Sequence, residues 1–155
     1  MCIRDRKYDT KVFKEKTDLI REVFPNAGLT TDIIVGFPGE TEANHQETIA
    51  FVKEIKFAKT HLFKYSKRDG TRAATMKGQV DGNVKKERLK DLEAIEKTNR
   101  EKFLENQVGK TLSVLFEEKS DMAGFKSGYS TNYLRVNVEN PSPVSYTHLT
   151  LPTTF

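Results

Sequence analysis

The spacing of apolar side chains along the first half of the chain predicts helices and strands in alternation. Apolar residues within Thr10–Phe24 recur three, four and seven positions apart, as on one face of a helix, and Asp9 or Thr10 is suited to cap its first turn. Leu29–Val35 then predicts a strand. Its consecutive apolar residues Ile33–Val35 indicate burial on both faces, as in a parallel sheet.

A second helix and a second strand follow. Thr41 or Glu42 begins the helix, and the residues expected on its inner side are Ile49, Val52 and Ile55. Lys59–Tyr65 alternates as a strand does. Helix, strand, helix and strand in this order predict an α/β fold whose parallel strands are joined by a right-handed crossover, in either a barrel or an open doubly wound sheet.

The second half of the chain predicts a long helix and a small β module. Ser66–Gly82 has the composition of a loop, and Val84–Asn106 predicts a heavily charged helix with a narrow apolar stripe, as expected of a connector docked along one side. From Lys110 the pattern changes to two short alternating strands, "TLSVLFEE" and "NYLRVNV", with a glycine-bearing turn between them. These strands predict a small antiparallel β module.

Composition adds limits to this picture. The chain has 155 residues, of which 36% are hydrophobic and 31% charged, and its formal net charge is +4. No apolar run approaches the roughly 18 residues of a membrane span. No segment resembles a signal peptide, so we expect a cytoplasmic location and no membrane partner. The mild excess of basic residues is compatible with nucleic-acid binding but indicates it only weakly.

The two ends of the chain are related at the level of nucleotides. A nucleotide sequence that can encode Met1–Arg6 has a reverse complement that can encode Val144–His148. We therefore expect residues 1–6 and 143–155 to derive from a library adapter, and we exclude them from the fold prediction. The only cysteine, Cys2, lies in the first of these segments, so no disulfide and no metal ligand set is expected in the native stretch, about Lys7–Ser142.

A Gly-Phe-Pro-Gly-Glu turn, Gly36–Glu40, follows the first predicted strand. Ligands of parallel α/β sheets bind at the carboxyl ends of the strands. Glycine allows the backbone to adopt φ > 0 and to approach a ligand closely, and Pro38 stiffens the turn. A phosphate-binding loop is not indicated, because the sequence has neither Gly-Lys-Ser/Thr nor G-x-G-x-x-G here. Residue spacing alone favours a simpler interpretation, a tight turn that caps the next helix.

Three longer segments resemble one family. They are "KYDTKVFKEKTDLIREVFPNAGLTTDIIVGFPGET", "HLFKYSKRDGTRAATMKGQV" and "KKERLKDLEAIEKTNREKFLENQVGKTLSVLFEE", and in this order they are similar to the C-terminal half of the radical S-adenosylmethionine methylthiotransferases. The resemblance implies the last αβαβ units of a partial (β/α) barrel that binds S-adenosylmethionine and a [4Fe–4S] cluster. It also implies a following TRAM domain, a small OB-like β-barrel that binds RNA.

The same resemblance implies a reaction, the addition of a methylthio group to C2 of a modified adenosine beside the tRNA anticodon. "MKGQVDGN" and "GYSTNYLRV" are most similar to the branch that acts on N6-threonylcarbamoyladenosine, and the isopentenyladenosine branch is the alternative. The cluster cysteines of the family fall upstream of Lys7. We therefore expect no catalytic residue and no metal ligand in this chain, and no activity from it alone. The parent enzyme is expected to be a monomer served by an electron donor that the sequence does not identify.

On this basis the chain divides into three native parts. We expect residues 7–82 to be the C-terminal part of the barrel, residues 83–107 to be a connecting helix, and residues 108–142 to be a truncated TRAM-like module.

The resemblance also implies which residues lie near the cofactor. Those that match the strand-end turn of the family, expected beside S-adenosylmethionine, are Asp32, Gly36, Phe37, Pro38, Gly39 and Glu40. Those that match its "YSxRxGT" segment, at the end of the last barrel strand, are Tyr65, Ser66, Arg68, Gly70 and Thr71. Lys67 and Arg72 replace prolines that are usual in the family. His45 replaces a residue that is usually aromatic, and we expect it to be solvated or to pack between helices.

Five residues of the β module interleave aromatic rings with positive charge, which suits base stacking and phosphate contacts. They are Lys110, Lys126, Tyr129, Tyr133 and Arg135. The alternative is that the tyrosines are half-buried strand residues and the lysines are solvated. Four cations of the long helix, Lys85, Lys86, Arg88 and Lys90, are expected to form a solvated face. A second function therefore remains open, a cofactor-free RNA-binding module built from the long helix and the β module.

Overall fold

The computed structural model describes residues 8–116, 124–139 and 146–150, and it divides into two compact units. Unit 1 is residues 1–102 and unit 2 is residues 103–155, and each is described by itself. The described residues form a mixed α/β structure, which confirms the predicted class. Among them, no helix is both long and apolar enough to cross a membrane.

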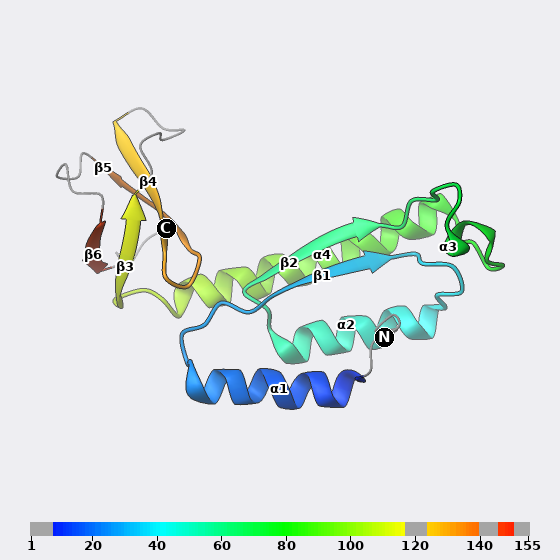
Figure 1. Ribbon diagram of the computed structural model, residues 1–155, viewed down its shortest axis with the longest axis horizontal. Coiled ribbons are helices and arrows are strands. Elements are labelled where there is room, and N and C mark those ends of the chain that lie inside the picture. Colours follow the sequence, from blue (N-terminus) through cyan, green and yellow to red (C-terminus); the bar gives the residue numbers. More distant parts are fainter. Residues whose placement is uncertain (1–7, 117–123, 140–145, 151–155) are drawn as a thin grey trace. The chain divides into compact units, whose positions relative to one another are not determined.

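Unit 1 has the predicted order of helix, strand, helix and strand (Figure 1). Its elements are α1 (Thr10–Val23), β1 (Thr30–Val35), α2 (Glu42–Ile55), β2 (Lys59–Lys64), α3 (Arg72–Thr75) and most of α4 (Gly82–Glu105). β1 and β2 are parallel, with Thr30 opposite Lys59 and Val35 opposite Lys64, as the sequence predicts. The short helix α3 lies within the segment predicted to be a loop.

Local capping explains where the helices begin. The Asp9 carboxylate accepts a hydrogen bond from Val12 N at 2.9 Å, so Asp9 is the N-cap of α1. α2 begins with a capping box in which Thr41 Oγ1 accepts from Asn44 N at 3.2 Å and Asn44 Oδ1 accepts from Thr41 N at 3.1 Å. The Asp81 carboxylate accepts from Asn83 N at 2.7 Å at the start of α4.

One face of the two-stranded sheet is covered by helices. The buried core of unit 1 combines residues of β1, α2, α4 and the α2–β2 connection: Ile33, Val35, Phe51, Val52, Ile55, Phe57 and Leu92. Phe13 of α1 joins it through an edge-to-face contact with Phe51, with 5.6 Å between the ring centroids. Figure 1 shows α2 running along one side of β1 and β2.

The other face of this sheet is not covered by described residues. The prediction that β1 is buried on both faces is wrong there, because Ile34 is 48% exposed whereas Ile33 and Val35 are buried. Side chains alternate between the two faces of a strand, and the helices cover only one of them. The uncovered face carries Asp32 and Ile34 from β1, which lie opposite His61 and Phe63 of β2.

Unit 2 contains a four-stranded antiparallel sheet in the order β5-β4-β3-β6. The strands are β3 (Thr111–Phe116), β4 (Phe125–Ser130), β5 (Arg135–Glu139) and β6 (Tyr146–Thr150). Its small core consists of Leu112 and Leu134, with Phe103, Leu104 and Val136 packed against them. The antiparallel module is therefore confirmed, but β4 was not predicted.

Two strand assignments in unit 2 differ from the prediction. β5 begins at Arg135 rather than near Asn132, because Tyr133 has φ = 62° and lies in the turn from β4 to β5. β6 lies in the segment excluded as adapter-derived, and its backbone pairs with β3. An edge strand offers free main-chain groups to any extended segment, so this pairing needs no specific side chains.

Candidate functional site

The carboxyl ends of β1 and β2 bring the predicted turn next to Tyr65. Tyr65 N donates to Val35 O at 2.8 Å, which continues the parallel pairing one step beyond β2. The rings of Phe37 and Tyr65 meet edge to face, with 5.4 Å between their centroids and 71° between their planes. This corner, which we call the strand-end corner, consists of Gly36–Glu40, Tyr65 and the α4 residues Lys85 and Arg88.

The Glu40 carboxylate holds the turn closed. Its Oε2 atom accepts hydrogen bonds from Gly36 N at 2.5 Å and from Phe37 N at 3.2 Å. Gly39 N donates to Gly78 O at 2.8 Å, so the loop before α4 is also tied to the turn. These backbone N–H groups are therefore engaged within the protein, and Glu40 has a structural role at this corner.

Arg88 holds Glu40 from the other side. The Arg88 side chain is only 7% exposed, and its Nη1 atom lies 3.1 Å from Glu40 Oε1 and donates to Glu40 O at 3.2 Å. Its Nη2 atom lies 3.4 Å from Glu42 Oε2. The prediction that Arg88 belongs to a solvated face is wrong, because a guanidinium offers enough planar donors to satisfy a carboxylate and a carbonyl together.

Lys85 explains why residue 36 must be a glycine. A Cβ atom on Gly36 would lie 2.3 Å from Lys85 Cγ, and Gly36 has φ = 71°. The Lys85 ammonium then reaches Tyr65, where Nζ donates to Tyr65 O at 3.3 Å and lies 5.3 Å from the ring centroid. Lys85 is half-buried rather than solvated, whereas Lys86 and Lys90 are exposed as predicted.

The remaining residues predicted near the cofactor are spread more widely. Asp32 lies on the uncovered face of β1, four residues before the turn. Ser66 and Arg68 are exposed in the loop after β2, where Arg68 O accepts from Thr71 Oγ1 at 2.7 Å. Tyr65 is half-buried, and its buried hydroxyl oxygen has no hydrogen-bond partner among the described residues.

His45 packs between α2 and α4. It is 1% exposed, and its Nε2 atom lies 3.1 Å from Asp91 Oδ2. The expectation of helix packing is therefore confirmed, and that of a solvated histidine is wrong.

Hydrogen bonds lower the pKa of two carboxyl groups near the strand-end corner. The backbone N–H of Asn83 is the main cause of a pKa of Asp81 below its ordinary value, and the charge of Lys85 acts in the same direction. The side-chain amide of Gln46 is the main cause of a lowered pKa of Glu42. Both carboxylates therefore favour their charged form in the folded protein.

The five predicted RNA-binding residues occupy different parts of unit 2. Tyr129 of β4 and Arg135 of β5 lie directly opposite each other, and both are exposed. Tyr133 is 84% exposed in the turn between these strands, so the half-buried interpretation is wrong for it. Lys126 is three positions before Tyr129 and therefore points to the other face of β4. Lys110 comes immediately before β3.

Metal ligands are not gathered at any place that the structure describes. Residues 8–116, 124–139 and 146–150 contain no group of three or more His, Cys, Asp or Glu side chains placed to hold a metal ion. Cys2 lies outside the described residues. The thiolates that an iron–sulfur cluster requires are therefore not supplied by this part of the chain.

Comparison with known proteins finds relatives with two enzyme names, although no family model matches the chain. The chain is 39% identical over 134 residues to the threonylcarbamoyladenosine tRNA methylthiotransferase MtaB of Bacillus subtilis, a match that covers 84% of this chain. It is 42% identical over 137 residues to the tRNA-2-methylthio-N(6)-dimethylallyladenosine synthase of the same organism, covering 88% of this chain. It is 40% identical over 130 residues to MtaB of Thermotoga maritima, covering 84% of this chain. The chain spans only 27–30% of the length of these relatives.

Proposed function

Because the chain is homologous to a segment of the tRNA methylthiotransferases, we propose that it forms part of a transferase that adds a methylthio group to an adenosine of tRNA. The observation that carries this proposal is an identity of about 40% over more than four fifths of the chain, held with relatives of both substrate types.

The finer proposal concerns the substrate. We propose C2 of N6-threonylcarbamoyladenosine, beside the anticodon, on the basis of the "MKGQVDGN" and "GYSTNYLRV" segments. Relatives that act on dimethylallyladenosine are as similar to the chain as those that act on threonylcarbamoyladenosine, so the second branch remains the alternative.

We further propose that unit 1 supplies the last strands of a barrel and that the uncovered face of β1 and β2 faces its interior. The exposed apolar residues Ile34 and Phe63 on that face, 48% and 52% exposed, suit an interior completed by further strands. Residues 7–82 would form this barrel part, residues 83–107 the connecting helix, and residues 108–142 the beginning of a TRAM domain.

We propose that the strand-end corner is where S-adenosylmethionine binds. Phe37 and Tyr65 meet edge to face there and offer aromatic surface to an adenine ring. When bound, S-adenosylmethionine supplies the radical chemistry of this family. Glu40 and Arg88 act by holding the turn in place. The described residues hold no ligand set for the cluster.

The test uses the longer protein that contains this segment. It is purified without oxygen, reconstituted with iron and sulfide, and given S-adenosylmethionine, a reductant and one of two tRNAs, bearing threonylcarbamoyladenosine or isopentenyladenosine. Mass spectrometry of the digested tRNA should show the methylthio group on the first substrate. A product on the second substrate alone would move the protein to the other branch, and no product on either would overturn the proposal.

A matched pair of variants tests the role of the turn in the same assay. Glu40→Gln should lower activity, because the Gln side chain can no longer accept both backbone N–H bonds and pair with Arg88. Glu42→Gln should retain activity, since the Glu42 side chain is 66% exposed and its contacts, with Arg88 Nη2 and with the Gln46 side chain, do not include the turn. Equal activities of the two variants would contradict the structural role of Glu40.

A second candidate function is a cofactor-free RNA-binding module. The observation that favours it is the opposed, exposed pair Tyr129 and Arg135 with Tyr133 beside it, which offers a ring and a cation to a single-stranded base and its phosphate. Binding of tRNA by the whole chain should weaken steeply with salt and fall further in Tyr129→Ala. An unchanged affinity in Tyr129→Ala and Arg135→Gln would remove this candidate.

A further inference from the structure

Lys85 places a positive charge at the carboxyl ends of the two parallel strands, where ligands of α/β sheets bind. We propose that the Lys85 ammonium, which Tyr65 holds in position, binds a phosphate group of the RNA substrate. This inference rests on the proposed function only in taking RNA as the ligand, and the binding group itself is argued from the contacts of unit 1.

The position of the ammonium is fixed before any ligand binds. The Lys85 stem passes so close to Gly36 that a Cβ atom there would lie within 3.0 Å of its Cγ, Cδ and Cε atoms. Tyr65 holds the other end through its carbonyl oxygen and its ring. A lysine normally loses much side-chain freedom when it binds an anion, and here that freedom is already restricted in the folded protein.

Among the described residues Lys85 forms no ion pair, although the Asp81 carboxylate is near enough for the two charges to interact. The Lys85 ammonium contacts the carbonyl oxygen and the ring of Tyr65, which are both neutral, whereas the neighbouring cation Arg88 is paired with Glu40 and Glu42. The nearby Asp81 carboxylate is engaged by Asn83 N at the start of α4. The ammonium therefore keeps donor capacity and charge for an external anion.

The other donors of the corner are already used. The N–H groups of Gly36 and Phe37 bond to Glu40, and that of Gly39 bonds to Gly78, so the glycine turn has no free backbone cradle at these three positions. A side-chain ammonium is left as the anion-binding group. A lysine acts on phosphate as a point charge, and a phosphate group of the RNA is therefore the ligand that suits this ammonium.

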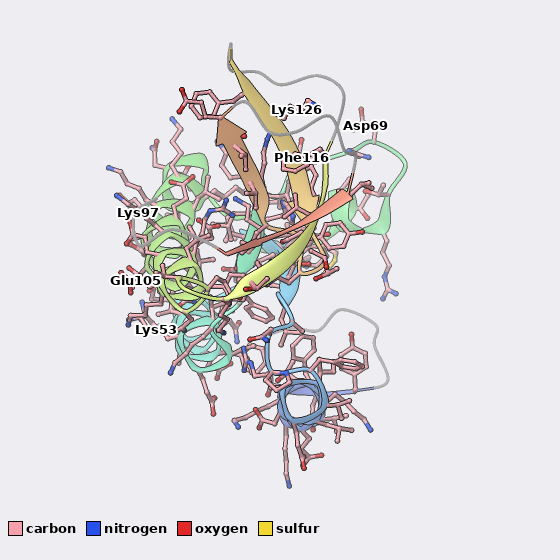
Figure 2. All side chains as sticks on the ribbon, turned by 90° about the vertical axis from the view of Figure 1, so that its left-hand side faces the viewer. Lys53, Asp69, Lys97, Glu105, Phe116 and Lys126 are labelled. Atoms are coloured by element: carbon pink, nitrogen blue, oxygen red, sulfur yellow. The ribbon has the colours of Figure 1, made fainter. Side chains whose placement is uncertain are left out.

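The experiment compares Lys85→Gln with Lys97→Gln in the whole chain. Lys97 lies on the same helix, its side chain is 78% exposed, and Figure 2 shows it on the outer side of α4. Affinity for a tRNA is measured by fluorescence anisotropy over a series of salt concentrations. Loss of one phosphate contact should reduce the slope of log affinity against log salt by about one and weaken binding roughly five- to tenfold near 0.1 M salt. Lys97→Gln should leave the slope at the wild-type value.

A second measurement separates this inference from the proposed function. The backbone amides of Gly36 and Tyr65 are followed by nuclear magnetic resonance while adenosine monophosphate or adenosine is added. The monophosphate should shift these signals in the wild type and in Lys97→Gln but not in Lys85→Gln, and adenosine should shift them less. If tRNA does not bind but the monophosphate response depends on Lys85, the phosphate site stands and the assignment of tRNA fails.

Two results would overturn the inference. One is an equal salt slope for wild type and Lys85→Gln when tRNA binds. The other is a monophosphate response that is missing in the wild type or unchanged in Lys85→Gln. Circular dichroism of each variant provides the check on folding, and Lys85→Gln keeps the Cγ methylene, which is the Lys85 atom nearest to the Cβ position of Gly36.

Discussion

Replacing Gly36 by alanine should destabilise unit 1 more than replacing Gly39, and the excess should depend on Lys85. Both glycines have positive φ, 71° and 84°, so alanine at either position adopts a left-handed conformation that costs roughly 1–2 kcal/mol. They differ in their surroundings. A Cβ atom at position 39 meets nothing within 4 Å, whereas one at position 36 would lie 2.3 Å from Lys85 Cγ.

The extra destabilisation by Gly36→Ala can be estimated from the contacts that Lys85 loses. To make room for a Cβ atom at position 36 its side chain has to leave Tyr65, losing a hydrogen bond of about 0.5–1.5 kcal/mol and a cation–π contact of about 0.5–1 kcal/mol. Gly39→Ala should therefore cost about 1–2 kcal/mol and Gly36→Ala about 2–4 kcal/mol. In a Lys85→Ala background the two substitutions should cost the same, because the obstructing stem is gone.

Urea unfolding of the six proteins, followed by circular dichroism at a helix-sensitive wavelength, measures this cycle. The helices α1 and α2 and most of α4 belong to unit 1, so the helical signal reports mainly on that unit. With a slope of about 1–3 kcal/mol per molar urea, the excess amounts to roughly 0.5–1 M in the unfolding midpoint. Equal midpoints for Gly36→Ala and Gly39→Ala would refute the steric argument. If Gly36→Ala still cost more than Gly39→Ala in the Lys85→Ala background, the difference would have a cause other than the Lys85 side chain.

Three further predictions concern α2 and α4. Arg88→Met should destabilise unit 1 by about 3–5 kcal/mol in the same urea assay, because it leaves the partly buried Glu40 carboxylate without its cation. The control Arg100→Met, on the exposed side of α4, should change the stability little. Thr41→Ala should cost about 1 kcal/mol through loss of the capping box of α2, and Thr98→Ala, within an exposed part of α4, should be neutral or slightly stabilising by the same measurement. The lowered pKa of Asp81 means that its charge stabilises the fold above its unfolded pKa, near 4, and that this contribution disappears as the pH falls through the folded pKa. The midpoint of Asp81→Asn should therefore lie below that of the wild type at pH 7 and approach it at pH 3, and a difference that stays constant with pH would contradict this sign.

The elements with strong local signals could be predicted from the sequence. The cap at Asp9, the capping box at Thr41 and the uninterrupted apolar run of β1 each depend on neighbouring residues, and the structure has all three. β4 was missed because "FKSGYS" has a glycine and two serines in six residues and a weak alternation. Position 128 requires glycine because a Cβ atom there would lie 2.4 Å from Leu115 O of β3. This constraint comes from the partner strand and cannot be read from the local sequence.

The strand-end corner was predicted only in part for a related reason. Its turn was recognisable from two glycines and a proline, but its partners on α4 were assigned to a solvated face because they are cations. Their spacing held a signal: Lys85 and Arg88 continue the stripe that runs through Leu92 and Ile95, at intervals of three and four residues. A position on the inner stripe of a helix faces the protein whatever its residue type. Charge was therefore a weaker guide than position.

The glycine turn shows how a structural requirement can resemble a ligand-binding motif. Positive φ, a close backbone approach and a nearby carboxylate are features of both. At Gly36 the last two have internal causes. The backbone lies close to the Lys85 side chain, and the Glu40 carboxylate accepts the N–H groups of Gly36 and Phe37. Once these internal partners are accounted for, the groups of this corner that we propose for ligand binding are side chains, namely the Lys85 ammonium and the rings of Phe37 and Tyr65. Recognition at the strand-end corner should therefore respond to substitution of these side chains. A Cβ atom at Gly39 would meet no neighbour in the protein, so the stability cost of Gly39→Ala should come from its positive φ.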